Sequence, residues 1–219
     1  MRLRLYAPFV AAVFLALPLL LASGSEATPI GPACGSCAGG VFDLTHSAAP
    51  IATTATTETW EITYTADLAT GPYTGGGSFL ESVAIKVAAN DTDFVTASLV
   101  SAPGGIAEWM EVSGGINAFG CSGEGAGFEC ARDKPPANAA PVSGGPYTWV
   151  WHVEVLTGTL LTGTNEASIK ARFVDAMGNK KGPLLSEHIT LSETPEPGMA
   201  LLLAGPLLLL GSRRGIRRP

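Results

Sequence analysis

The chain is poor in histidine and lacks the residue spacings that mark common catalytic sites. It has three histidines, His46, His152 and His188, and none has a second histidine at a metal-binding spacing. No Gly-x-Ser-x-Gly nucleophile elbow occurs, and Asn90-Asp91-Thr92-Asp93 lacks the closing glutamate of a calcium loop. We therefore predict a protein that is not an enzyme and has no catalytic residue, metal site or cofactor.

Basic residues are scarce between the two ends of the chain. The whole chain has 13 Lys and Arg residues against 19 Asp and Glu residues. Six of the arginines lie in the first four or the last seven residues, so removing both ends, with Glu26, leaves 7 basic and 18 acidic residues, a net charge of −11. This balance argues against nucleic acid as a partner, because phosphates require Lys and Arg. It favours solubility through self-repulsion over loose binding of divalent cations.

Helical periodicity is also missing from the interior of the chain, and alternation of apolar and polar residues takes its place. Trp60, Ile62 and Tyr64 alternate with polar residues, which is typical of a half-buried strand. The same criterion, with short apolar β-branched runs, predicts strands over 60–65, 82–87, 94–100, 109–112, 147–155, 168–173 and 187–191. Gly- and Pro-rich turns separate them. We predict an all-β, antiparallel β-sandwich, with a jelly-roll-like arrangement as one possible form.

The predicted domain organisation has four parts. Residues 1–27 form a signal peptide, 28–58 an N-terminal segment or linker, 59–191 the sandwich domain, and 192–219 a C-terminal sorting signal. Residues 48–59 are either a linker or an edge strand, and the proline-rich stretch 133–143 is a long loop.

Four cysteines lie in the part that would remain after removal of the ends: Cys34, Cys37, Cys121 and Cys130. An even number of cysteines in an exported chain predicts disulfides rather than a zinc site. Cys121 and Cys130 flank a glycine-rich loop that is easily closed, whereas Cys34 and Cys37 could pair locally or with that loop, so the connectivity stays open. A redox role for Cys34-Gly35-Ser36-Cys37 is disfavoured because poor helix formers follow it.

The last 25 residues carry three features in a fixed order. A tripeptide comes first, an apolar run over 198–211 follows, and four arginines close the chain: Pro195, Glu196, Pro197, Arg213, Arg214, Arg217 and Arg218. This tail resembles the PEP-CTERM sorting signal of exported bacterial proteins. The resemblance implies cleavage by an exosortase near the tripeptide, in a Gram-negative host that makes extracellular polysaccharide. It covers only the tail and implies a destination rather than an activity.

The physical properties of the tail fit a transient anchor. Its 14 apolar residues would rise about 21 Å as a helix, against a hydrocarbon core of about 30 Å. Pro206 would weaken that helix, and the arginines mark the cytoplasmic side. The alternatives are a lasting C-terminal membrane anchor or a buried helix.

The N-terminus predicts export as well. Arg2 and Arg4 precede an apolar stretch over 7–22, and small residues before Ala27 offer a cleavage site after that residue. We expect an exported protein that passes transiently through the inner membrane and ends at the cell surface or in the extracellular matrix.

Two local patterns offer alternative functions. Trp149 and Trp151 share a strand face with Tyr147; this face is either part of the core or an exposed platform for stacking on sugar rings. Glu108 and Glu111 flank Trp109, which resembles the paired acids of glycosidases, although solvated acids are commoner. The leading hypothesis is a structural or adhesive protein of the exopolysaccharide; a carbohydrate-binding module is the alternative, and a secreted hydrolase is the third.

Overall fold

The computed structural model of the chain describes residues 28–71, 73–122, 125–136 and 138–194. The described part is all-β, and its one helical turn is the 3-10 turn η1 (Ile106–Glu108). No helix among these residues is long and apolar enough to cross a membrane. The signal peptide predicted over 1–27 and most of the predicted sorting signal, 195–219, lie outside the described residues.

The first sheet, sheet A, has the strand order β13-β1-β3-β10-β5, with β2 paired to β3. Neighbours are antiparallel except β1 and β13, which are parallel. Its strands are β1 (Val41–His46), β2 (Ala52–Thr53), β3 (Thr57–Asp67), β5 (Phe94–Ser101), β10 (Tyr147–Leu156) and β13 (Ser192–Glu193).

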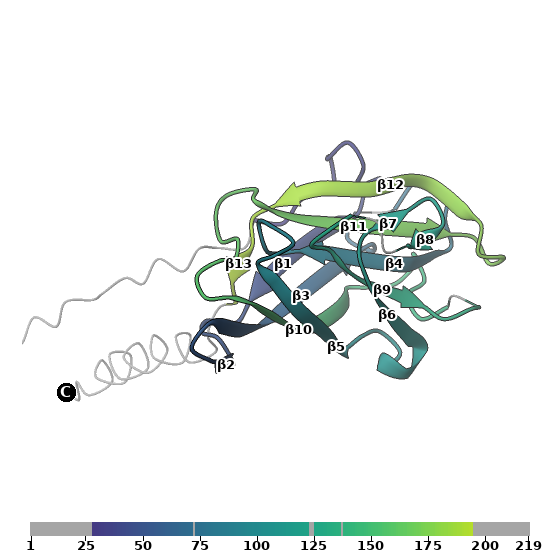
Figure 1. Cartoon of the computed structure of the whole chain (residues 1–219). Helices are drawn as coiled ribbons and strands as arrows, with labels where there is room; N and C mark the ends of the chain where they lie inside the picture. The colour runs from purple at the N-terminus through teal and green to yellow at the C-terminus, as the bar shows by residue number, and fades with distance from the viewer. Residues whose placement is uncertain (1–27, 72, 123–124, 137, 195–219) are drawn as a thin grey trace, which may run out of the picture.

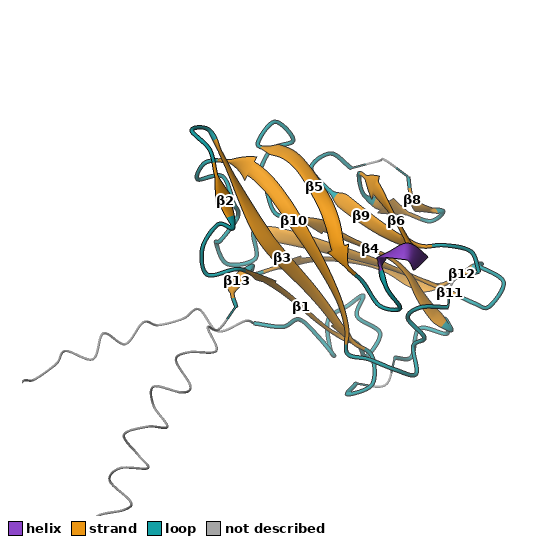
Figure 2. Cartoon of the chain, turned by 90° about the horizontal axis from the view of Figure 1, so that it is seen from below, coloured by secondary structure: helices purple, strands orange, loops and turns teal. Residues whose placement is uncertain are grey.

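The second sheet, sheet B, is antiparallel with the order β12-β11-β4-β9-β6. Its strands are β4 (Phe79–Lys86), β6 (Trp109–Ser113), β9 (Glu129–Asp133), β11 (Ala167–Val174) and β12 (Lys180–Ile189). A small hairpin, β7 (Ile116–Asn117) and β8 (Gly120–Cys121), lies between β6 and β9 in the chain. Figures 1 and 2 show the two sheets as separate layers.

The two sheets enclose one hydrophobic core, which is consistent with a β-sandwich. Side chains from β1, β3 and β10 of sheet A and from β4, β11 and β12 of sheet B belong to the same buried cluster. The sequence-based prediction of an all-β, antiparallel fold is confirmed.

The order in which the strands connect is that of an immunoglobulin-type sandwich. In that order the first, second, fifth and fourth strands form one sheet, and the third, sixth and seventh form the other. Here β1, β3, β10 and β5 form the first group and β4, β11 and β12 the second, with the β6–β9 segment inserted between β5 and β10. The observed connectivity therefore differs from the jelly-roll-like form that the sequence left open.

Trp149 and Trp151 face the core of this sandwich. Both side chains are fully buried, and the burial of β10 alternates as its sequence predicts. The ring of Trp149 makes edge contacts with Tyr64 from β3, at 5.6 Å between centroids, and with Trp109 from β6, at 5.2 Å. Because Trp109 belongs to sheet B, this aromatic group joins the two sheets. The hypothesis of an exposed sugar-stacking platform at Trp149 and Trp151 is wrong, and the core alternative holds.

Five strands were not predicted from the sequence, namely β1, β9, β13 and the two short strands β7 and β8. β1 lies in the presumed linker 28–58, and β13 lies in the region assigned to the sorting signal, yet both belong to sheet A. β9 was hidden because Glu129 and Asp133, two of its buried side chains, are acidic and interrupt the apolar alternation. The edge-strand alternative for residues 48–59 is correct at β2.

Replacing Trp149 by alanine should lower the free energy of unfolding by about 3–5 kcal/mol, because it leaves a large cavity between the sheets. His152→Ala, on the other face of β10, should change it by about 0.5 kcal/mol or less. Urea denaturation of the two variants provides the comparison. Equal stability of both variants would contradict the assignment of Trp149 to the core.

Candidate functional site

The outer face of sheet B is partly covered by one segment, residues 114–122 and 125–128, which we call the stapled loop. A disulfide between Cys121 and Cys130 ties this loop to β9, and Ile116 packs on Ala84 and Cys130. The backbone N–H of Gly114 donates to the carbonyl of Phe128, which closes the base of the loop. A covalent staple limits the conformations of a loop that is rich in glycine.

Both disulfides are local in sequence. Cys34 pairs with Cys37, and Cys121 pairs with Cys130, so the described part contains no free cysteine. The sequence left the connectivity open, and the structure resolves it in favour of local pairing at both sites. No group of three or more metal-ligating side chains that could hold a metal ion occurs among the described residues.

A buried ion-pair cluster lies under the turn of the stapled loop. Glu81 of β4 accepts hydrogen bonds from Arg132 Nε of β9 at 2.7 Å and from Arg172 Nη1 of β11 at 2.5 Å. The hydroxyl of Ser82 donates to the same carboxylate at 2.6 Å, and Arg172 Nε donates to the carbonyl of Ala118 at 3.0 Å. Buried charges require this degree of pairing. The cluster therefore links three strands of sheet B to the loop above them.

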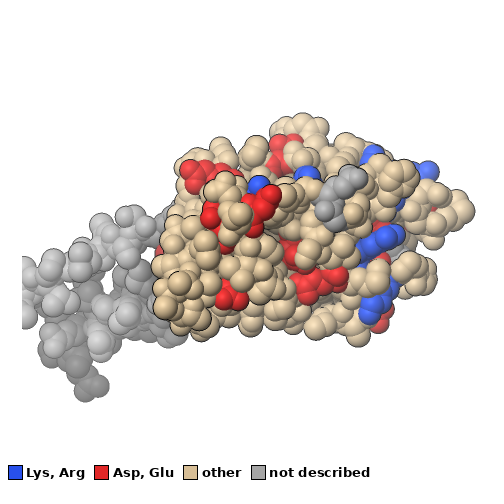
Figure 3. All heavy atoms as spheres, in the orientation of Figure 1, with Lys and Arg blue, Asp and Glu red and all other residues tan. Residues whose placement is uncertain are grey.

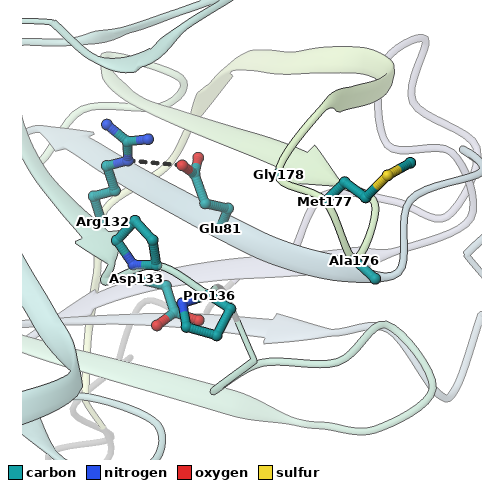
Figure 4. Close-up of a pocket in the computed structure, with 8 residues that line it drawn as sticks. Glu81, Arg132, Asp133, Pro136, Ala176, Met177 and Gly178 are labelled. Atoms are coloured by element: carbon teal, nitrogen blue, oxygen red, sulfur yellow. Dashed lines mark hydrogen bonds and ion pairs between the residues drawn. The ribbon is translucent and has the colours of Figure 1, made fainter.

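One recess opens beside this cluster, and we call it the Arg132 recess. Its volume is about 360 Å³. Figure 4 shows Arg132 and Glu81 pointing toward one another from neighbouring strands, with the turn between β11 and β12 close by. The recess is lined by Glu81, Arg132, Asp133, Pro135, Pro136, Ala176, Met177 and Gly178. The recess therefore combines the partly exposed guanidinium of Arg132 with apolar walls from the prolines and Met177.

A second, more open recess of about 610 Å³ lies over β4, β11 and β12. Phe128 is part of its lining, and Lys170 Nζ lies 4.3 Å from the centroid of that ring, a cation–π contact. Ser168 Oγ and His188 Nδ1 lie 3.1 Å apart on opposite strands within it. A serine nucleophile also needs an acid that orients the histidine, and among the described residues no acidic side chain is hydrogen-bonded to His188.

Lysine and arginine are segregated to one side of the molecule. All seven such residues in the described part lie in strands of sheet B or, for Lys134, one residue beyond β9. The strands of sheet A carry six acidic residues and no basic one. Figure 3 shows most of the visible basic residues toward one end of the molecule, and acidic residues predominate at the other. A chain with a strongly acidic balance therefore presents a locally basic face.

The remaining residues that the sequence singled out have local roles. His46, which lies in the segment 28–58 predicted as an N-terminal segment or linker, is a buried residue of β1 with an edge contact to Trp60. His152 Nε2 lies 3.7 Å from Glu61 on the outer face of sheet A. Asn90 Nδ2 donates to Asp93 Oδ2 at 2.7 Å, as in a polar turn.

The acidic pair Glu108 and Glu111 is not brought together as a pair. The charge of Glu108 contributes to the raised pKa of Asp133, whereas the charge of Glu111 contributes to the raised pKa of Glu129. Burial and then the charge of Glu111 raise the pKa of Glu129 to about 7. Sequence analysis missed Glu129 because it follows a glycine-rich loop, which carries no sign of burial.

No protein-family model matches this chain, and a search of curated proteins finds no match. The function must therefore be argued from the residues and from the two recesses of sheet B.

The free energy of unfolding should fall as the pH rises from weakly acidic to weakly basic, because of Glu129. Its folded pKa of about 7 exceeds the usual value of 4.5, so folding favours the protonated form. The stability that protonated Glu129 contributes is fully present below about pH 4.5 and is lost as the pH rises through about 7. We expect the free energy of unfolding to be about 1–3 kcal/mol lower at pH 8 than at pH 5.

Glu129→Gln should remove most of this pH dependence, whereas Glu154→Gln, on the outer face of sheet A, should preserve it. Chemical denaturation of the three proteins at several pH values provides the measurement. An unchanged slope in Glu129→Gln would show that another group is responsible.

Proposed function

We propose that this protein is an exported protein of the cell surface or extracellular matrix, sorted and cleaved through a PEP-CTERM signal by an exosortase. Its role is structural or adhesive within the exopolysaccharide and is not enzymatic. The observation that carries the proposal is the three-part tail over 195–219. The two disulfides support it, because disulfides persist in oxidising, extracytoplasmic compartments.

The way the described chain ends is compatible with removal of the tail. β13 pairs with β1, and Thr194 donates hydrogen bonds from its N–H and its hydroxyl to the carbonyl of His46. The last described strand of sheet A therefore ends before Pro195. Cleavage near the tripeptide would leave every described strand in place.

Carbohydrate binding is a second candidate function, which we propose for the outer face of sheet B. The observation that favours it is the pair of recesses beside the stapled loop, which offer Phe128, Arg132 and His188 as accessible side chains. The buried pair Trp149 and Trp151 no longer contributes to this hypothesis. A secreted hydrolase is the least supported alternative, because Ser168 and His188 form a pair rather than a triad.

The intact mass of the protein recovered from its host tests the proposal. We expect a mass that corresponds to cleavage after Ala27 and near Pro197, with alkylation of four cysteines only after reduction. We also expect the cleaved form in the extracellular polysaccharide fraction. A mass that retains Arg213, Arg214, Arg217 and Arg218, found only in the inner membrane, would instead identify the tail as a lasting anchor and overturn the proposal.

A further inference from the structure

We propose that the Arg132 recess binds the carboxylate of an acidic sugar unit, and that the protein thereby holds an anionic, uronate-type polysaccharide. This inference rests on the proposed function, because it names the class of matrix polymer that the protein would contact. It concerns the Arg132 recess, whose residues can be substituted without changing the C-terminal tail.

Arg132 is only partly used within the protein. Its Nε donates to Glu81, and about a third of its side chain is exposed. No hydrogen bond from its two terminal nitrogens to a described residue is present. A guanidinium engaged only through Nε keeps two parallel N–H groups, which match the two oxygens of a carboxylate. The anchoring bond to Glu81 fixes this side chain before a ligand arrives, which reduces the entropy lost on binding.

The acidic residues that line the recess are already occupied. Glu81 accepts bonds from two arginines and Ser82, so this cluster carries one positive charge more than it carries negative charges. Asp133 Oδ2 accepts the N–H groups of Asn138 and Ala139, and burial raises the pKa of Asp133. Asp133 Oδ1 has no partner among the described residues, but it is buried, so the hydrogen-bonding group that a ligand can reach is the partly exposed guanidinium of Arg132, a donor that suits an anion.

The walls of the recess suit the apolar face of a sugar ring. Pro135, Pro136 and Met177 supply rigid or adaptable apolar surface, and 83% of Met177 is exposed. On the opposite side, a Cβ placed on Gly120 would lie 3.5 Å from Arg132 Cζ, so the tip of the stapled loop borders the cation. Phe119, which follows Ala118 at this tip, is 82% exposed. Met177 and Phe119 are the most exposed large apolar side chains of the described residues, and both lie in turns next to Arg132.

A polymer would gain from the charge pattern around the recess. The remaining basic residues of the described part also belong to this sheet, so further carboxylates along a chain would meet favourable charge. Repeated weak contacts along one polymer strengthen the overall binding. Sheet A, with its six acids, would repel the same polymer.

The test uses the full chain in mild detergent and measures binding to immobilised polygalacturonate. Dextran serves as the neutral polymer and dextran sulfate as an anionic polymer without carboxylates. We expect binding to polygalacturonate, little binding to dextran, and weaker binding to dextran sulfate than to polygalacturonate. Equal or tighter binding to dextran sulfate would overturn carboxylate recognition in favour of general attraction between opposite charges.

Three variants locate the site. Arg132→Gln removes the cation and should weaken binding to polygalacturonate at least tenfold. Ala176→Glu places a carboxylate in the wall of the recess at an exposed position, where it either repels the ligand or occupies Arg132. Lys134→Gln is the matched control, because it removes one positive charge from a side chain that donates to the carbonyl of Ala107. It should weaken binding less than threefold.

Each outcome is decisive. Loss of binding in Arg132→Gln and in Ala176→Glu but not in Lys134→Gln supports the recess. If Arg132→Gln does not fold, the comparison of Ala176→Glu with Lys134→Gln is sufficient to test the recess. Equal weakening in all three variants, unchanged binding in Ala176→Glu, or no binding by the unaltered protein overturns the inference. The proposed function is judged separately by intact mass and location, so either can fail without the other.

Discussion

Edge-on packing of Trp149 against Tyr64 and Trp109 is the contact on which the arrangement of this molecule depends. Trp149 lies near the start of β10, which pairs with β3 and β5, whereas Trp109 begins β6 in the other sheet. Aromatic rings bury large apolar areas and pack with defined geometry, so this group fixes which face of each sheet points inward. The opposite faces then point away from the core, because side chains alternate along a strand.

The outer face of sheet B illustrates that consequence. Once the core has fixed the inward residues of β4, β9 and β11, Glu81, Arg132 and Arg172 meet beneath the stapled loop. Their pairing offsets the cost of burying charge and holds the loop in place together with the disulfide at Cys121. Arg132 lies at the margin of this cluster, where it is both held in position and accessible. The same contacts that stabilise the loop therefore prepare a binding surface.

Charge composition alone gave an incomplete picture of possible partners. The excess of acid argued against nucleic acid as a partner, but the fold gathers the few lysines and arginines on one sheet. Strand alternation and apolar periodicity predicted most of sheets A and B, including the face of β10 that Trp149 and Trp151 share. They failed for β9, where buried acids replace apolar residues, and for the short β1, whose polar neighbours resemble a linker.

The sequence by itself determined the all-β class, the face of β10 that Trp149 and Trp151 share, the expectation of disulfides, and the expectation of export carried by the two ends of the chain. These properties depend on local periodicity, on short-range spacing or on composition. Only the tertiary structure decided that Trp149 and Trp151 are core residues, and that Glu81, Arg132 and Arg172 converge. Those residues lie 51 and 91 positions apart from Glu81. Contacts across such separations depend on strand order and register, which local patterns do not specify.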